Sequence, residues 1–330
     1  DQLIAAVRAH LPSVHRYYEL RRRLLGLDEI HHYDCYVPLV PELEQKHTWD
    51  EAIQEIVESL QPLGAAYCDQ LEAGLRGRWC DRYPNVGKQS GAFSSGTYDS
   101  DPYILMNFQE DVIEHVFTLA HEAGHSMHTR LSADAQPFQY AGYTIFVAEV
   151  ASTFNEQLLT RHLLSKADSP KQRAAIISRE IDAIRATIIR QTMFAEFERM
   201  SHGAVESGEP LTLEKIRSLY RELLTAYFGT GFSIDQELEL ESLRIPHFYR
   251  AFYVYKYATG LSASIALSKR VTEGGPEELD AYLQFLRGGC SKWPLDLLRD
   301  AGVDLETPEP VGLALTRFGE LVEELEKLLG

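Results

Sequence analysis

The sequence predicts a mainly helical protein with one small antiparallel β-sheet. Apolar residues recur every three or four positions over most of the 330 residues, the spacing of helices that bury one face. Turn-forming residues and short apolar runs alternate most clearly in residues 88–108. Apolar residues make up 45% of the chain and charged residues 25%, so the chain can bury a core of ordinary size.

Several helices can be placed from caps and apolar spacing. Thr48 and Glu51 form a capping box, and helical spacing continues from there to Leu60. Pro62 ends that helix or begins another. Further helices are predicted over residues 111–131, 145–164, 171–200, 213–228, 249–269 and 313–329.

The strand signal lies within residues 88–108. Two groups of turn-forming residues, 94–97 and 99–102, separate the short run Gly91–Phe93 from the apolar run Tyr103–Phe108. This arrangement predicts a β-hairpin or a small antiparallel sheet. Because no repeat, linker or shift in composition divides the chain, we treat residues 1–330 as one region without an internal boundary.

Charge and cysteine content restrict the partners and the compartment. The chain has 32 Lys and Arg against 49 Asp and Glu, a net charge of −17, which disfavours nucleic acid and anionic membranes as partners. No apolar run is long enough for a signal peptide or a membrane helix. Four cysteines without a C-x-x-C pair are typical of free thiols, so we predict a cytoplasmic protein.

The segment His121-Glu122-Ala123-Gly124-His125 has the pattern H-E-x-x-H on a predicted helix. Residues four apart lie about 40° apart around a helix and about 6 Å along it, so both imidazoles can reach one metal ion. Glu122 can reach a water on that metal, take its proton and later pass the proton to the leaving amine. Two surface histidines would be a simpler interpretation, but the surrounding helix is apolar.

A hydrolytic zinc site needs a third protein ligand and an open position. The predicted helix 145–164 offers Glu149, Glu156 and His162. Glu149 and Glu156 are seven residues apart and share a face, so periodicity cannot choose between them. Glu149 stands among apolar residues, where a metal or a buried ion pair would satisfy it, whereas a solvated or supporting role is the simpler interpretation of Glu156.

A second polar cluster follows Pro246. His247 is followed by Tyr249, Tyr253 and Tyr257, which recur every four residues and would form one stripe of a helix. Tyrosine hydroxyls or an imidazole N–H could stabilise the oxyanion of peptide hydrolysis, so these residues are candidates for catalysis and substrate binding. Aromatic core packing explains the stripe equally well.

These residues resemble the oligoendopeptidase F branch of the thimet-oligopeptidase-like zinc metallopeptidases. The similar segments span nearly the whole chain in the expected order: Tyr33–Leu39, Ser90–Phe93, Ile104–Phe108, Phe117–His128, Phe146–Glu156, Ile245–Tyr249 and Tyr257–Gly260. The resemblance implies a helical zincin-type fold with a deep substrate channel. It also implies one Zn²⁺ per chain, held by His121, His125 and Glu149.

The resemblance further implies which residues meet the substrate. Unstructured oligopeptides would be cleaved because a narrow channel excludes folded proteins. The strand around Gly91, Ala92 and Phe93 would pair with the extended peptide as an added strand. His247 and Tyr257 would stabilise the transition state, with Tyr253 as the rival of Tyr257.

The family's N-terminal helical portion has no counterpart in a chain that starts at Asp1, so a separate or missing N-terminal portion is an expected partner. The main hypothesis is a zinc-dependent endopeptidase with Glu122 as general base. One alternative is a non-hydrolytic fragment that holds zinc and peptide and needs the missing portion for activity. Another is a protein without metal, in which the histidines belong to the core.

Overall fold

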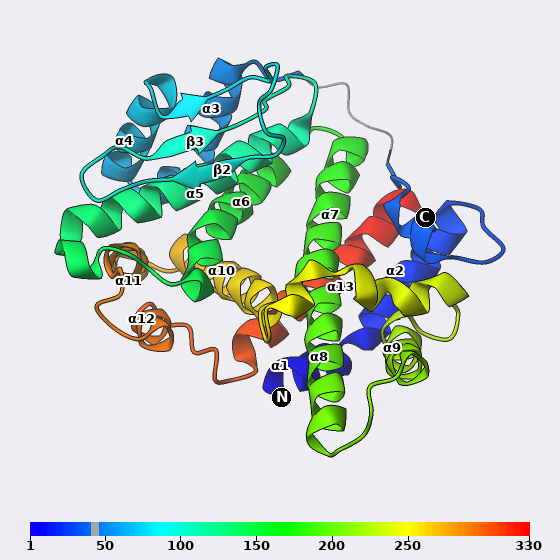
Figure 1. Ribbon diagram of the computed structural model, residues 1–330. Coiled ribbons are helices and arrows are strands. Elements are labelled where there is room, and N and C mark those ends of the chain that lie inside the picture. Colours follow the sequence, from blue (N-terminus) through cyan, green and yellow to red (C-terminus); the bar gives the residue numbers. More distant parts are fainter. Residues whose placement is uncertain (41–45) are drawn as a thin grey trace. The chain divides into compact units, whose positions relative to one another are not determined.

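The computed structural model describes residues 1–40 and 46–330. It confirms a mainly helical protein with a small sheet (Figure 1). The chain forms two compact units that are interleaved along the sequence. Unit 1 comprises the described residues of Asp1–Glu42, Asp168–Ser262 and Glu306–Gly330, and unit 2 those of Leu43–Ala167 and Ala263–Leu305.

Unit 1 is built around long amphipathic helices. The α-helices assigned to it are α1 (Gln2–Ala9), α2 (Leu11–Leu24), α7 (Pro170–Ile184), α8 (Arg190–Glu206), α9 (Leu213–Phe228) and α13 (Glu309–Leu329). α13 packs along α7 and α2, and α9 packs on α8. Short 3₁₀ turns at His32–Tyr36, Gln236–Arg244 and Pro246–Tyr249 connect these elements.

Unit 2 contains the sheet and the helices beneath it. Its elements are α3 (Trp49–Ser59), α4 (Ala65–Arg76), β1 (Cys80–Asp81), β2 (Phe93–Ser95), β3 (Tyr103–Leu105), α5 (Ile113–Ala135), α6 (Ile145–Lys166), α11 (Pro276–Arg287) and α12 (Pro294–Asp300). α5 and α6 pack closely against each other, and β2 lies along α5 (Figure 1). α10 (Tyr255–Glu273) continues from unit 1 into unit 2.

The predicted antiparallel sheet is only partly correct. β2 and β3 are antiparallel, with Ser94 opposite Ile104, but β1 adds a parallel strand on the other side of β3. The sheet is therefore mixed. Of the predicted run Gly91–Phe93, only Phe93 is in a strand, and residues 94–95, which we expected in a turn, complete β2. Strands of two or three residues are too short to show a period in the sequence.

Two helix predictions need correction. The helix expected over residues 171–200 contains a π-turn at Arg185–Ile189 between α7 and α8, and it continues to Glu206. The helix expected over residues 249–269 begins only at Tyr255. Pro246 starts a separate 3₁₀ turn, and Phe252 has a φ of 56°, which no right-handed helix accommodates. Tyr249, Tyr253 and Tyr257 therefore do not form one helical stripe.

The remaining helix predictions agree with the structure within a few residues. Thr48 caps α3, accepting the backbone N–H of Glu51 while the Glu51 carboxylate accepts the backbone N–H of Thr48. In the described part of the chain, no helix has both the length and the apolar character needed to cross a membrane.

Candidate metal centre

The H-E-x-x-H segment lies in the middle of α5, where this helix packs against α6. Gly124 makes that close approach possible, because a Cβ atom there would lie 2.6 Å from the Ala151 carbonyl oxygen and 2.6 Å from Ser152 Cα. Asn155 adds a hydrogen bond from its amide to the Ala120 carbonyl at 3.2 Å. The start of α6 is thereby held beside the two histidines.

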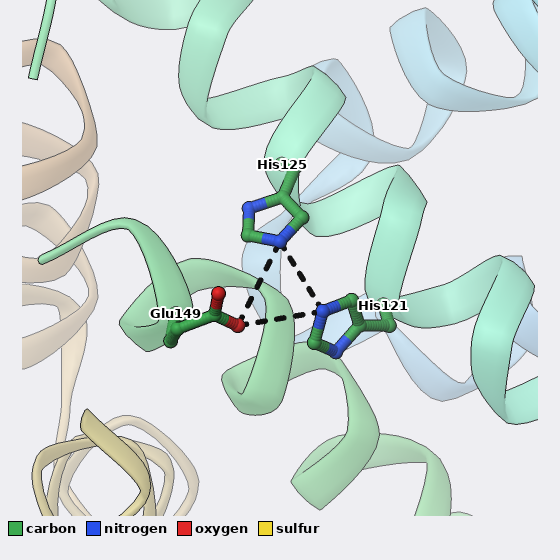
Figure 2. A group of neighbouring side chains, drawn as sticks. All are labelled: His121, His125 and Glu149. Carbon is green, nitrogen blue, oxygen red and sulfur yellow. Dashed lines mark hydrogen bonds and ion pairs between the residues drawn. The ribbon is translucent and has the colours of Figure 1, made fainter. Parts of the chain in front are cut away.

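Three ligand atoms converge between α5 and α6, from His121, His125 and Glu149 (Figure 2). The Nε2 atoms of His121 and His125 are 3.2 Å apart. Glu149 Oε2 lies 3.4 Å from Nε2 of His121 and 3.8 Å from Nε2 of His125. The Ser152 hydroxyl lies 3.3 Å from Glu149 Oε2 and 3.1 Å from the Glu149 carbonyl oxygen, so it can donate to either acceptor.

These distances fit a small tetrahedral ion. Ligand atoms about 2.0–2.1 Å from a tetrahedral zinc ion are separated by about 3.4 Å from one another. The observed separations of 3.2, 3.4 and 3.8 Å bracket that value. Two imidazoles and one carboxylate are also a donor set that zinc hydrolases use. The residues therefore fit a zinc ion and leave a fourth direction open.

Glu156 contacts His121 at the ring nitrogen that faces away from the other two ligand atoms. Its Oε1 lies 2.8 Å from Nδ1 of His121, so Nδ1 can donate a hydrogen bond and leave Nε2 free to bind a metal. Burial works to lower the pKa of His121, but its hydrogen bond with Glu156 and the charges of the nearby glutamates raise it on balance. A cluster of carboxylates this close together favours a bound cation.

Glu122 is almost fully buried, with 7% of its surface exposed. Burial raises the pKa of its carboxyl group, His121 opposes this effect, and the charge of Glu149 adds to it. A hydrogen bond from the Ser94 backbone reaches Glu122, so the carboxylate lies beside strand β2. Burial also lowers the pKa of His125 to about 3, which keeps this imidazole neutral, as a ligand must be.

Other histidines in this unit pack against rings, bond to the backbone or join ion pairs, and they do not belong to the group of three ligand atoms. The ring of His128 is buried and stacks on Tyr143 at a centroid distance of 3.7 Å. His115 Nδ1 accepts the backbone N–H of Gln109 at 2.9 Å. His162 on α6 lies near Glu55 and Glu58 of α3, but Lys166 Nζ is 2.7 Å from Glu58 and supplies a positive charge there. We interpret that second group as an ion-pair network.

The predicted second cluster is brought together in part, within unit 1. Tyr257 OH lies 3.2 Å from Nε2 of His247. The ring of Tyr253 is 5.6 Å from that of His247 and 5.7 Å from that of Tyr257. Tyr249 is 87% exposed in its 3₁₀ turn and is not in this group of rings.

The predicted peptide-binding strand is at the edge of the sheet. β2 is the outer strand next to β3, and its Ser94 hydroxyl lies 2.8 Å from the Ser126 hydroxyl on α5. Gly91 and Ala92 precede the strand, with Gly91 at a φ of 89°. The Asn107 side chain donates to the Gly91 carbonyl at 2.9 Å.

The sequence does not indicate the roles of several residues that support this site. Gly124 occupies one of the two variable positions of H-E-x-x-H, although the close contact between α5 and α6 requires glycine there. Ser94, Ser152 and Asn155 act through contacts across elements, which no local pattern reveals.

The model of peptidase family M3 matches residues 1–316. The chain belongs to peptidase family M3. It is 47% identical over 329 residues to the oligopeptidase PepF of Bacillus subtilis and 41% identical to an oligoendopeptidase F homolog of Lactococcus lactis. These matches cover 100% of this chain but 49% and 54% of the two relatives, so the chain spans about half of their length.

Solved structures of similar sequence show the same fold. A crystal structure from Chlamydophila abortus has a TM-score of 0.91 and 41% identity, covering 99% of this chain and 55% of that one. The oligoendopeptidase F of Enterococcus faecium has a TM-score of 0.78 and 34% identity, over 99% of this chain and 52% of that one. The expected resemblance and the helical metallopeptidase fold are confirmed.

Proposed function

We propose that this M3-family chain is the catalytic part of a zinc-dependent endopeptidase that hydrolyses short, unstructured oligopeptides. The observation that carries the proposal is the near-tetrahedral spacing of His121 Nε2, His125 Nε2 and Glu149 Oε2. Glu122, buried beside this group, supplies a carboxylate for proton transfer. The names of the relatives support oligopeptides as the substrate class.

When bound, zinc would supply Lewis acidity and lower the pKa of a coordinated water to about 7. Glu122 would accept the proton of the attacking water on its buried carboxylate. It would then deliver the same proton to the nitrogen of the departing amine. Glu156 would keep His121 Nδ1 protonated, which fixes the tautomer and the direction of the ring.

Two further groups would act on the peptide itself. The backbone of β2 would bind an extended peptide as an added strand, with Gly91, Ala92 and Phe93 leading into it. His247 and Tyr257 would donate hydrogen bonds to the developing oxyanion, since the Tyr257 hydroxyl and His247 Nε2 lie together, 3.2 Å apart. Tyr253 and the exposed Tyr249 would contact substrate side chains.

Cleavage of a quenched fluorescent oligopeptide tests this function directly. We expect cleavage by the purified chain, loss of cleavage in a chelator, and recovery when zinc is added back. A folded protein containing the same peptide sequence should resist cleavage. Activity that persists in metal-free protein would contradict the zinc proposal, and zinc-loaded protein that cleaves no oligopeptide would show that this chain is not a self-sufficient enzyme.

A further inference from the structure

The connection between His247 and Tyr257 contains an unusual backbone conformation. Among residues 1–40 and 46–330, Phe252 is the one residue other than glycine with a positive φ, at 56°. This left-handed region is disfavoured for a bulky aromatic residue. Since the ring of Phe252 is half exposed, packing of the side chain alone does not account for the conformation. Something else must hold the backbone there.

The carboxylate of Glu198 holds that backbone. Glu198 lies on α8, is 3% exposed, and accepts the backbone N–H of Phe252 at its Oε1. The ring of His202, one turn further along α8, lies 4.8 Å from the Phe252 ring. A buried carboxylate needs a hydrogen-bond donor, and here the donor is the strained residue itself.

The same helix also holds the segment that carries His247. Phe248 packs against Phe194 and Phe197 of α8, at ring distances of 6.0 and 5.5 Å. The residue next to His247 and the middle of the following connection are thus both attached to α8. From there the chain turns into α10, where Tyr257 OH meets His247 Nε2 at 3.2 Å.

We propose that Glu198 is a positioning residue that holds Phe252 in the left-handed turn and thereby sets the contact between His247 and Tyr257. The effect of Glu198 on turnover rests on the proposed function of His247 and Tyr257. Without the carboxylate, Phe252 would return to a common backbone conformation and redirect residues 250–254. His247 would then lose its fixed distance from the Tyr257 hydroxyl. Displacements of about 1 Å in such a pair can cost up to about 100-fold in rate.

Two matched pairs of variants test this in the full chain. Glu198→Gln keeps an oxygen acceptor of the same reach, whereas Glu198→Met keeps the size and removes the acceptor. Phe252→Gly accepts the left-handed turn without strain, whereas Phe252→Val, which is β-branched, opposes it. The readouts are kcat, KM and zinc content for oligopeptide cleavage, together with the imidazole NMR signals of His247, assigned with His247→Asn.

We expect Glu198→Met and Phe252→Val to lower kcat about 10- to 100-fold, with KM and zinc content within about twofold of wild type. Their His247 signals should shift. Glu198→Gln and Phe252→Gly should stay within about threefold of wild type in kcat and should keep its His247 signals. This split between kcat and KM, and the rescue by glutamine, would not follow from a general loss of stability.

Unchanged kcat and His247 signals in Glu198→Met and Phe252→Val would overturn the proposal. If Phe252→Gly and Phe252→Val lost kcat equally, the effect would come from the missing aromatic ring and not from the left-handed turn. That result would also overturn the proposal. If Glu198→Met does not fold, the Phe252 pair decides alone. If the wild-type chain loaded with zinc cleaves no peptide, the chain is not a self-sufficient enzyme, and the His247 NMR signals alone decide the role of Glu198.

Discussion

Glu122 has the position and the burial of a proton-transfer group, but it is not among the three converging ligand atoms. We therefore expect Glu122→Gln to keep its zinc and to lose turnover by about 100- to 10,000-fold, because an amide cannot accept the proton. Metal content by atomic emission and kcat on an oligopeptide are the two measurements. Asp134→Asn, at the exposed end of the same helix, is the matched control and should behave as wild type.

Zinc content and kcat together distinguish the possible roles of Glu122. A variant that loses zinc together with activity would show that Glu122 binds or supports the metal. A variant that cleaves at the wild-type rate would remove Glu122 from the mechanism.

Glu156 would act on a bound metal through the ring of His121, whose Nδ1 lies 2.8 Å from Glu156 Oε1. Replacing Glu156 with glutamine removes the charge that holds Nδ1–H, and such changes cost about 10- to 100-fold in metal affinity. We expect Glu156→Gln to bind zinc more weakly by this factor while folding normally, whereas Glu149→Gln should lose more because it removes a ligand charge. Competition with a chromogenic chelator measures both affinities. Equal zinc affinity in Glu156→Gln and wild type would show that the hydrogen bond is incidental.

The sequence predicts part of this site at the scale of single residues. The four-residue spacing of His121 and His125 is a property of any helix, so their convergence could be predicted without a structure. Periodicity left Glu149 and Glu156 equivalent, and only the packing of α6 on α5 separates them: Glu149 meets both Nε2 atoms, and Glu156 meets Nδ1 of His121.

At the scale of elements, the site depends on how closely α5 approaches α6. A Cβ atom at residue 124 would overlap the Ala151 carbonyl oxygen and Ser152 Cα, both backbone atoms that cannot rotate away. We expect Gly124→Ala to destabilise the chain by about 1–3 kcal/mol through this overlap, despite the better helix propensity of alanine. Zinc affinity should fall too, because Glu149 is carried by the displaced helix.

Gly203 provides the matched control for that substitution. It lies in α8, and a Cβ atom there would meet nothing within 4 Å. Gly203→Ala should therefore stabilise the chain by about 0.5–1 kcal/mol. Urea unfolding of the two variants measures the difference. If Gly124→Ala were as stable as Gly203→Ala and bound zinc normally, the close helix contact would not be a requirement of the site.

Local signals predicted elements well where the signal is long or chemically specific. The capping box at Thr48 and the apolar spacing after it located α3 to within a residue. The same reasoning failed for residues 249–254, since the helical spacing of tyrosines continues through a segment in which Phe252 has a positive φ and donates its backbone N–H to Glu198 on α8. β1 was missed because two residues paired to β3, over 20 positions away, leave no local pattern.

At the scale of the whole molecule, the division into two units could not be predicted from composition. Unit 1 is assembled from three separate stretches of chain and unit 2 from two. One of the crossings between the units, between Ser262 and Ala263, lies within the continuous helix α10, so no local break in the sequence marks it. Long-range packing, not local sequence, defines it.

The pH dependence of folding is also a property of the whole chain, and His32 makes a contribution that can be isolated. Its ring lies 5.9 Å from that of Phe228, and its Nε2 is buried and has no hydrogen-bond partner among the described residues. Burial, aided by the charge of Arg190, lowers the pKa of His32 to about 4 from the usual 6.5. The folded state therefore resists a proton that the unfolded chain accepts.

The sign follows from this difference in proton binding. Between pH 6.5 and pH 4 the unfolded chain binds the proton and the folded chain does not, so the free energy of unfolding falls as the pH is lowered. The loss from His32 alone is at most about 3 kcal/mol. Paired carboxylates with lowered pKa values, such as that of Glu326, add their own loss only below about pH 4.5.

We expect His32→Gln, which cannot take up a proton, to lose about 2–3 kcal/mol less than wild type between pH 6.5 and pH 4. Urea unfolding of metal-free protein across this range measures the effect without a contribution from bound zinc. His10→Gln, in the same unit, controls for the removal of a histidine as such. If His32→Gln lost as much stability as wild type over this interval, the buried ring would take up its proton in the folded state, and the acid sensitivity of the chain would have to arise elsewhere.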